Sequence, residues 1–147
     1  MLKGLLANHV LWAALTAWLI AQVLKLFTSY YRTGKIDFQR LVGAGGMPSS
    51  HAALVVALAM AIGWNRGFDS VAFAMAFVMA GVVMYDASGV RQAAGKQAKV
   101  LNKLLQDLRH HHSIPETRLK ELLGHTPLEV VAGALLGVLV AWLFCGG

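Results

Sequence analysis

The sequence predicts an all-α integral membrane protein that forms a single domain over residues 1–147. Three observations predict this fold class: hydrophobic residues make up 57% of the chain, the mean hydropathy is +0.59, and several apolar stretches approach the length that crosses a bilayer. A soluble fold with these stretches would leave too little polar surface. We therefore expect about four transmembrane helices and an interfacial amphipathic helix.

The apolar stretches define the expected membrane helices. They comprise residues 5–24, 48–64, 68–85 and 127–144. The middle two are short against the roughly 20 residues of a usual span, so core helices of a soluble protein are the competing interpretation. We expect the first stretch to remain as a structural helix, because no small-residue cleavage site is followed by a soluble domain. In the last stretch, Gly133 and Gly137 predict close packing against another helix.

A histidine stands at the start of the second apolar stretch. Pro48 suits the first position of a helix, where its missing N–H costs no hydrogen bond, and Ser49 and Ser50 can cap the helix. The free N–H groups of a helix N-terminus and the positive end of its dipole attract anions. This arrangement predicts an anion site beside His51.

A similar arrangement opens the last apolar stretch. His125 precedes Thr126 and Pro127, and Thr126 has the capping-box spacing to Glu129. Glu129 also lies one helical turn from His125, so its carboxylate has two interpretations: a helix cap, or a group that orients the imidazole. Two histidines at two helix N-termini indicate phosphate chemistry.

Four ionisable residues lie at the expected membrane edge. Lys25 and Arg32 are two helical turns apart and share a face, so they can reach one point, or each can extend to the lipid headgroups. Asp86 and Arg91 follow the third apolar stretch. Ionisable residues at this depth are functional candidates, and a local salt bridge between Asp86 and Arg91 is the alternative.

Residues 93–112 predict an amphipathic helix. Its apolar face comprises Val100, Leu101, Leu104, Leu105 and Leu108. Its polar face comprises Lys96, Lys99, Lys103 and Asp107. We expect this helix to lie on the membrane surface, and a soluble helix packed on the bundle is the alternative. The histidine run 110–112 predicts no metal site, because consecutive residues point in different directions around a helix.

The basic residues are unevenly distributed along a chain whose formal net charge is +6. Four spans would place residues 25–47 and 86–126, which carry most of the positive charge, on one side of the membrane. Lys3 and Arg66 would lie on the other side. The positive-inside rule then predicts that both histidine-bearing helix starts face the cytoplasm from the plasma (inner) membrane, with both termini outside. Nucleic-acid binding is not expected of this basic chain.

Three ordered segments resemble the signature motifs of the type 2 phosphatidic acid phosphatase superfamily, which also contains vanadium haloperoxidases. The segments are Lys25-x6-Arg32, Pro48-Ser49-Ser50-His51 and His125-x-Pro127-x-Glu129. The corresponding family patterns are Lys-x6-Arg-Pro, Pro-Ser-Gly-His and Ser-Arg-x5-His-x3-Asp. Residues 84–91 look like the poorly characterised divergent branch of this family.

The resemblance implies a membrane phosphatase that acts on lipid phosphates or lipid diphosphates without a metal or another cofactor. By position, His125 would be the nucleophile that forms a phosphohistidine, and His51 the acid that protonates the leaving alcohol. Glu129 would orient His125. The expected partners are a phosphorylated lipid and the bilayer.

The resemblance also implies that Lys25, Arg32 and the amides near Ser49 and Ser50 hold the phosphate. Three motif residues depart from the family pattern: Thr33, Ser50 and Glu129 stand where the family has Pro, Gly and Asp.

One motif residue is missing, because Leu119 stands where the family has an arginine six residues before the nucleophile. We expect Arg91 to supply this charge, with residues 92–124 inserted between the two halves of the motif. Arg118 and Lys120 are the alternatives. Asp86 is an accessory candidate at the same membrane edge.

The chain has about four of the six helices of the family core. The missing helices would expose bundle surface, so we expect a homodimer. The altered third motif leaves a second function open: a catalytically inactive relative that binds phospholipid or serves as a membrane scaffold.

Overall fold

The computed structural model describes residues 2–34, 46–109 and 124–146, and these residues form helices and no strands. The helices are α1 (Leu2–Leu6), α2 (His9–Thr33), α3 (Ser50–Arg66), α4 (Val71–Tyr85), the π-helix η2 (Asp86–Val90), α5 (Arg91–Arg109) and α6 (Pro127–Cys145). The all-α fold class is confirmed for the described part of the chain.

Helix α3 lies at the centre of the bundle. It packs against α2, α4 and α6, and α2 also packs against α6. The core between them consists mostly of alanines: Ala13, Ala17 and Ala21 of α2, Ala53, Ala57 and Ala61 of α3, and Ala141 of α6 with Val140. Small side chains let helix backbones approach closely, which is how helices associate when the surrounding solvent is lipid.

The predicted close packing at Gly133 and Gly137 is confirmed. A Cβ atom at Gly133 would overlap the carbonyl oxygen of Ser49, and one at Gly137 would lie 2.6 Å from the carbonyl oxygen of Ala53. The backbone of α6 therefore rests directly on the first turns of α3.

Three segments of the described helices are long and apolar enough to cross a membrane: His9–Tyr31, Val71–Gln106 and Pro127–Cys145. Helix α3, with 17 residues, is shorter and is enclosed by its neighbours. Large apolar side chains are exposed on α4 and α6, among them Val71, Met75, Val78, Val82, Leu135, Leu139 and Leu143. Such faces suit contact with lipid chains.

Two helix starts differ from the sequence-based expectation. The first apolar stretch is interrupted at Asn8, whose side chain accepts a hydrogen bond from the N–H of Leu11 and caps α2, and α2 then continues to Thr33. Pro48 precedes the helix instead of occupying its first position, because Ser49 is the N-cap of α3. The start of α6 is as predicted, with Thr126 as N-cap.

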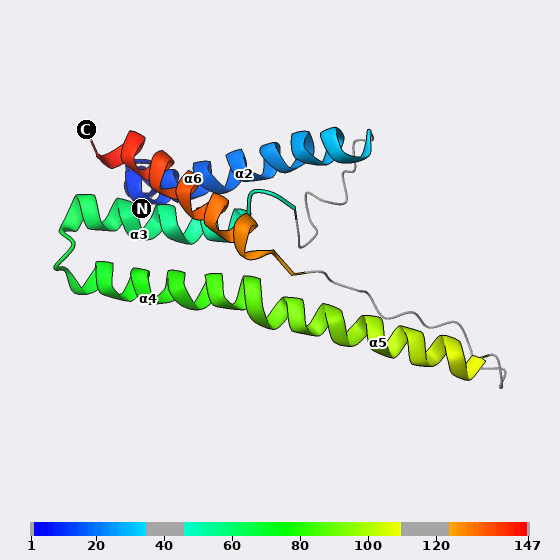
Figure 1. Cartoon of the computed structure of the whole chain (residues 1–147). Helices are drawn as coiled ribbons and strands as arrows, with labels where there is room; N and C mark the ends of the chain where they lie inside the picture. The colour runs from blue at the N-terminus through cyan, green and yellow to red at the C-terminus, as the bar shows by residue number, and fades with distance from the viewer. Residues whose placement is uncertain (1, 35–45, 110–123, 147) are drawn as a thin grey trace.

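Helix α5 confirms a helix in the predicted amphipathic segment. Figure 1 shows that α5 continues the line of α4 past the end of the bundle. Val100, Leu101 and Leu104 are exposed on it. Its place on a membrane surface stays an expectation, and the predicted residues 110–112 lie outside the described residues.

The bundle has two distinct ends. Both chain termini lie at one end, whereas the starts of α3 and α6 lie at the other (Figure 1). The two histidine-bearing segments are therefore on the same side of the bundle, as the order of the helices predicted.

Candidate active site

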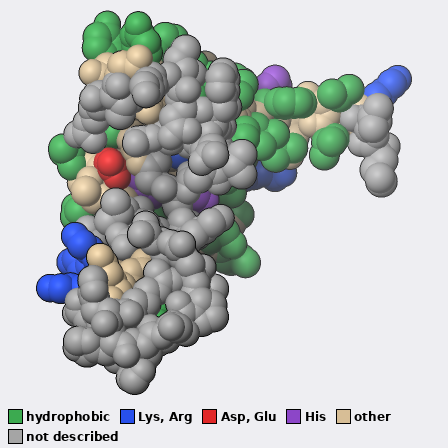
Figure 2. All heavy atoms as spheres, turned by 90° about the vertical axis from the view of Figure 1, so that its right-hand side faces the viewer, with side chains coloured by type: hydrophobic (Ala, Val, Ile, Leu, Met, Phe, Trp, Pro, Cys, Tyr) green, Lys and Arg blue, Asp and Glu red, His purple; other side chains and the backbone are tan. Residues whose placement is uncertain are grey.

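The structure brings His51 and His125 together. His51 lies in the first turn of α3, and His125 directly precedes Thr126, the N-cap of α6. Their ring centroids are 6.3 Å apart, and the ring planes are inclined by 63°. Figure 2 views the molecule from this end, and histidine side chains are visible near the middle of it. The two imidazoles are therefore neighbours at the starts of α3 and α6.

His125 is buried and held from two directions. Its Nδ1 lies 3.2 Å from Oε2 of Glu129, its backbone N–H donates to the carbonyl oxygen of Ala87 at 3.0 Å, and the residue is 1% exposed. A carboxylate at Nδ1 favours the tautomer that carries its proton there, which leaves the lone pair on Nε2. A lone pair on Nε2 is compatible with the predicted nucleophile role of His125, which stays a prediction.

Glu129 serves both of the roles that its spacing indicated. Oε2 accepts a hydrogen bond from the backbone N–H of Thr126 at 3.0 Å and also contacts His125. Oγ1 of Thr126 in turn accepts from the backbone N–H of Glu129 at 3.4 Å, which completes the capping box. Because the cap holds the carboxylate, the helix start also fixes the direction of the imidazole.

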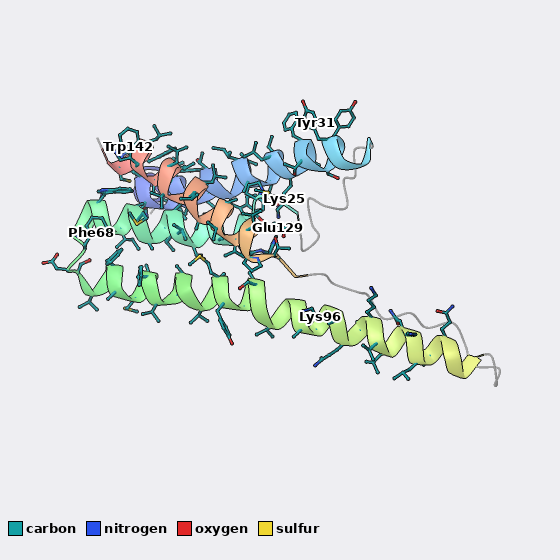
Figure 3. All side chains as sticks on the ribbon, viewed as in Figure 1. Lys25, Tyr31, Phe68, Lys96, Glu129 and Trp142 are labelled. Atoms are coloured by element: carbon teal, nitrogen blue, oxygen red, sulfur yellow. The ribbon has the colours of Figure 1, made fainter. Side chains whose placement is uncertain are left out.

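Lys25 reaches into the bundle instead of extending to the headgroups. The residue is 2% exposed, and its Nζ donates to Oγ of Ser50 at 2.8 Å. Figure 3 shows Lys25 and Glu129 near each other at this end of the bundle. A buried ammonium group is costly without an anion nearby, and the Glu129 carboxylate supplies a favourable electrostatic interaction here. The role of Lys25 in holding a phosphate stays a prediction.

Ser49 links the starts of α3 and α6. Its backbone N–H donates to the carbonyl oxygen of Glu129 at 2.9 Å, and its side-chain oxygen accepts from the N–H of Ala52 at 3.4 Å. Ser49 thus caps α3, whereas the hydroxyl of Ser50 accepts the hydrogen bond from Lys25.

Thr28 of α2 holds the segment that precedes α3. Its Oγ1 donates a hydrogen bond to the carbonyl oxygen of Met47 at 2.7 Å.

The π-helix η2 supplies a contact that the sequence reasoning missed. Ala87 lies within η2 and provides the carbonyl oxygen that anchors His125. π-Helical turns occur frequently at functional sites. The sequence marks this segment by its ionisable residues and by its resemblance to the divergent branch, and neither signal predicts the backbone contact. Asp86 is the first residue of η2, and its backbone N–H donates to the carbonyl oxygens of Val82 and Val83. Its accessory role stays a prediction.

Four predicted basic residues cannot be placed by side-chain contacts. The backbone of Arg32 belongs to α2 and that of Arg91 begins α5, but both side chains lie outside the described residues. Arg118 and Lys120 also lie outside them. The assignment of the missing motif arginine stays a prediction.

Comparison with known proteins decides the family. The family model of the divergent PAP2 family matches residues 6–140. The chain belongs to the divergent PAP2 family. The match spans every helix from α2 through most of α6, and the resemblance inferred from the motifs is thereby confirmed.

The divergent PAP2 chain also has a close relative in sequence. The "Uncharacterized membrane protein YuiD" of Bacillus subtilis (strain 168) is 40% identical to it, in an alignment that covers 92% of this chain and 93% of that protein. No solved structure matches the chain. This divergent PAP2 protein is therefore a membrane protein, and its described residues include three candidate transmembrane helices.

Proposed function

We propose that this chain is a membrane phosphatase that removes phosphate from lipid phosphates or lipid diphosphates through a phosphohistidine intermediate at His125. The observation that carries the proposal is the Glu129–His125 pair at the start of α6, facing His51 at the start of α3. Membership in the divergent PAP2 family and an apolar exterior support a lipid substrate.

The first step is nucleophilic attack on phosphorus. Nε2 of His125 forms the N–P bond while the bond from phosphorus to the leaving oxygen breaks. His51 donates a proton to that oxygen, so the lipid alcohol leaves uncharged. For a diphosphate, the leaving group is the lipid monophosphate. The Glu129 carboxylate stabilises the positive charge that develops on the imidazole of His125.

The second step is hydrolysis of the phosphohistidine. His51, now deprotonated, accepts a proton from a water molecule that attacks phosphorus, and the N–P bond breaks to release inorganic phosphate. Lys25 and the N–H groups at the start of α3 stabilise the phosphoryl oxygens in both steps. Both histidines return to their starting states.

The cytoplasmic orientation of this site, in the plasma (inner) membrane, remains part of the proposal. It is supported by the uneven distribution of basic residues along the chain. The alternative function, a catalytically inactive phospholipid-binding or scaffold protein, is favoured by Leu119 in place of the family's arginine. The expected homodimer is likewise a proposal.

Phosphate release by the purified protein tests the proposed function. We expect turnover of at least one among phosphatidic acid, phosphatidylglycerophosphate and polyprenyl diphosphate with a metal chelator present. Lys25→Met is expected to lower the rate by roughly a hundredfold, since one fixed charge that stabilises a transition state is worth about that much. Lys3→Met is the matched control, because Lys3 is exposed at the opposite end. No turnover of any of these lipids by the wild type would favour the binding or scaffold function.

A further inference from the structure

A groove runs along the outside of the bundle between η2 and α4 on one side and α6 on the other. Its volume is about 420 Å³. Met84, Tyr85 and Ser88 form one wall, and side chains of α6 between Pro127 and Val138 form the other. Helices α4 and α6 both pack against α3 and contact each other little, which leaves the groove between them.

One end of the groove adjoins the histidine pair. Val130 lines the groove and also packs in a cluster with Ala52 and Ala87. Ala52 directly follows His51 in α3, and Ala87 supplies the carbonyl oxygen that accepts the N–H of His125. This end of the groove therefore lies beside the helix segments that carry the two histidines.

The groove has the polarity and the length of a hydrocarbon chain. Tyr85 and Ser88 are the polar side chains that line it, and both lie at the end near the histidines. The α6 wall of the groove, from Pro127 to Val138, extends about 16 Å at 1.5 Å per helical residue, whereas the opposite wall spans residues 84–88. One half of the roughly 30 Å hydrocarbon core of a bilayer has a similar thickness.

We propose that this groove binds one hydrocarbon chain of the phosphorylated lipid whose phosphate lies between His51 and His125. The inference rests on the proposed function. A groove within a bilayer is filled by hydrocarbon, and the chain that continues into a phosphate beside the histidines is the substrate's own. Because the chain leaves one apolar environment for another, the groove gains little from burial. Its contribution is to position the phosphate for attack.

Filling the groove tests this assignment. Ala134→Trp places an indole in the groove, whereas Leu143→Trp places one on the exposed face of α6 outside it. We expect Ala134→Trp to lower the ratio of phosphatidic acid turnover to p-nitrophenyl phosphate turnover at least tenfold relative to Leu143→Trp. An equal ratio in the two variants would overturn the assignment. If the wild type hydrolyses neither substrate, the proposed function fails. Lipid labelling then tests separately whether the groove binds the chain of a phosphorylated lipid.

The labelling uses phosphatidic acid with a photoreactive diazirine in its acyl chain, added to the wild-type protein in nanodiscs. We expect cross-links within residues 84–88 and 127–138, and fewer of them in Ala134→Trp. Diacylglycerol with the same diazirine is the matched probe, and equal labelling by both probes would show that the groove takes any bulk lipid chain. A cysteine at position 134, introduced as Ala134→Cys in a Cys145→Ser background, tests whether a second copy of the chain occupies the groove. A disulfide-linked dimer in native membranes would place that copy in the groove and overturn the proposal.

Discussion

Replacing His125 by alanine is expected to lower phosphate release by on the order of a thousandfold or more, because the variant lacks the atom that forms the N–P bond. The loss should appear in kcat, since Lys25 and the N-terminus of α3 remain to bind phosphate. His125→Gln is expected to lose as much activity while filling most of the buried volume. The measurement compares phosphate release by the two variants with that by the wild type, using the lipid that the wild type hydrolyses fastest.

A matched control separates chemistry from folding. His9 is an exposed histidine at the start of α2, at the end of the bundle far from the candidate site. His9→Ala should retain wild-type turnover. Turnover by His125→Gln within tenfold of the wild type, with the protein monodisperse, would rule out His125 as the nucleophile.

The second large effect is expected at Gly133. A Cβ atom there overlaps the Ser49 carbonyl oxygen, so Gly133→Ala must push α6 away from the start of α3. Overpacking of this kind costs about 1–3 kcal/mol. The shift would also separate His125 from His51, so we expect a lower unfolding midpoint together with reduced phosphate release.

Gly81 provides the contrast, because nothing lies within 4 Å of a Cβ atom added there in α4. Gly81→Ala should stabilise the protein by roughly 0.5–1 kcal/mol through the better helix propensity of alanine. Thermal unfolding of the two variants in the same detergent should therefore shift in opposite directions. An unfolding midpoint of Gly133→Ala that is no lower than that of Gly81→Ala would contradict the close contact between α6 and α3.

Local features of the fold could be predicted from the sequence because their causes are local. The start of α6 follows from Thr126, Pro127 and Glu129, which lie within one helical turn. The start of α3 was predicted less well, since Ser49 and Ser50 can both cap and only tertiary packing decides between them. The cap at Asn8 is not evident from the sequence, because Asn8 lies within a long stretch that is mostly apolar.

Contacts between distant segments could be predicted only in part. The motif resemblance indicated that His51 and His125 act together, and the structure places their rings beside each other. The hydrogen bond from Lys25 to Ser50 joins α2 to α3, and no rule of sequence spacing predicts it. The hydrogen bond from the N–H of His125 to the carbonyl oxygen of Ala87 uses only backbone atoms, so no side-chain pattern predicts it.

Isotopic labelling can detect the proposed phosphohistidine intermediate at His125. Wild-type protein is mixed with phosphatidic acid carrying ³²P, quenched in alkaline denaturant within one turnover, and mapped by proteolysis. We expect an acid-labile, alkali-stable label on the peptide that contains His125, and no label in His125→Gln. A label on another residue, or full single-turnover phosphate release with no labelled protein at any time, would contradict the phosphohistidine mechanism.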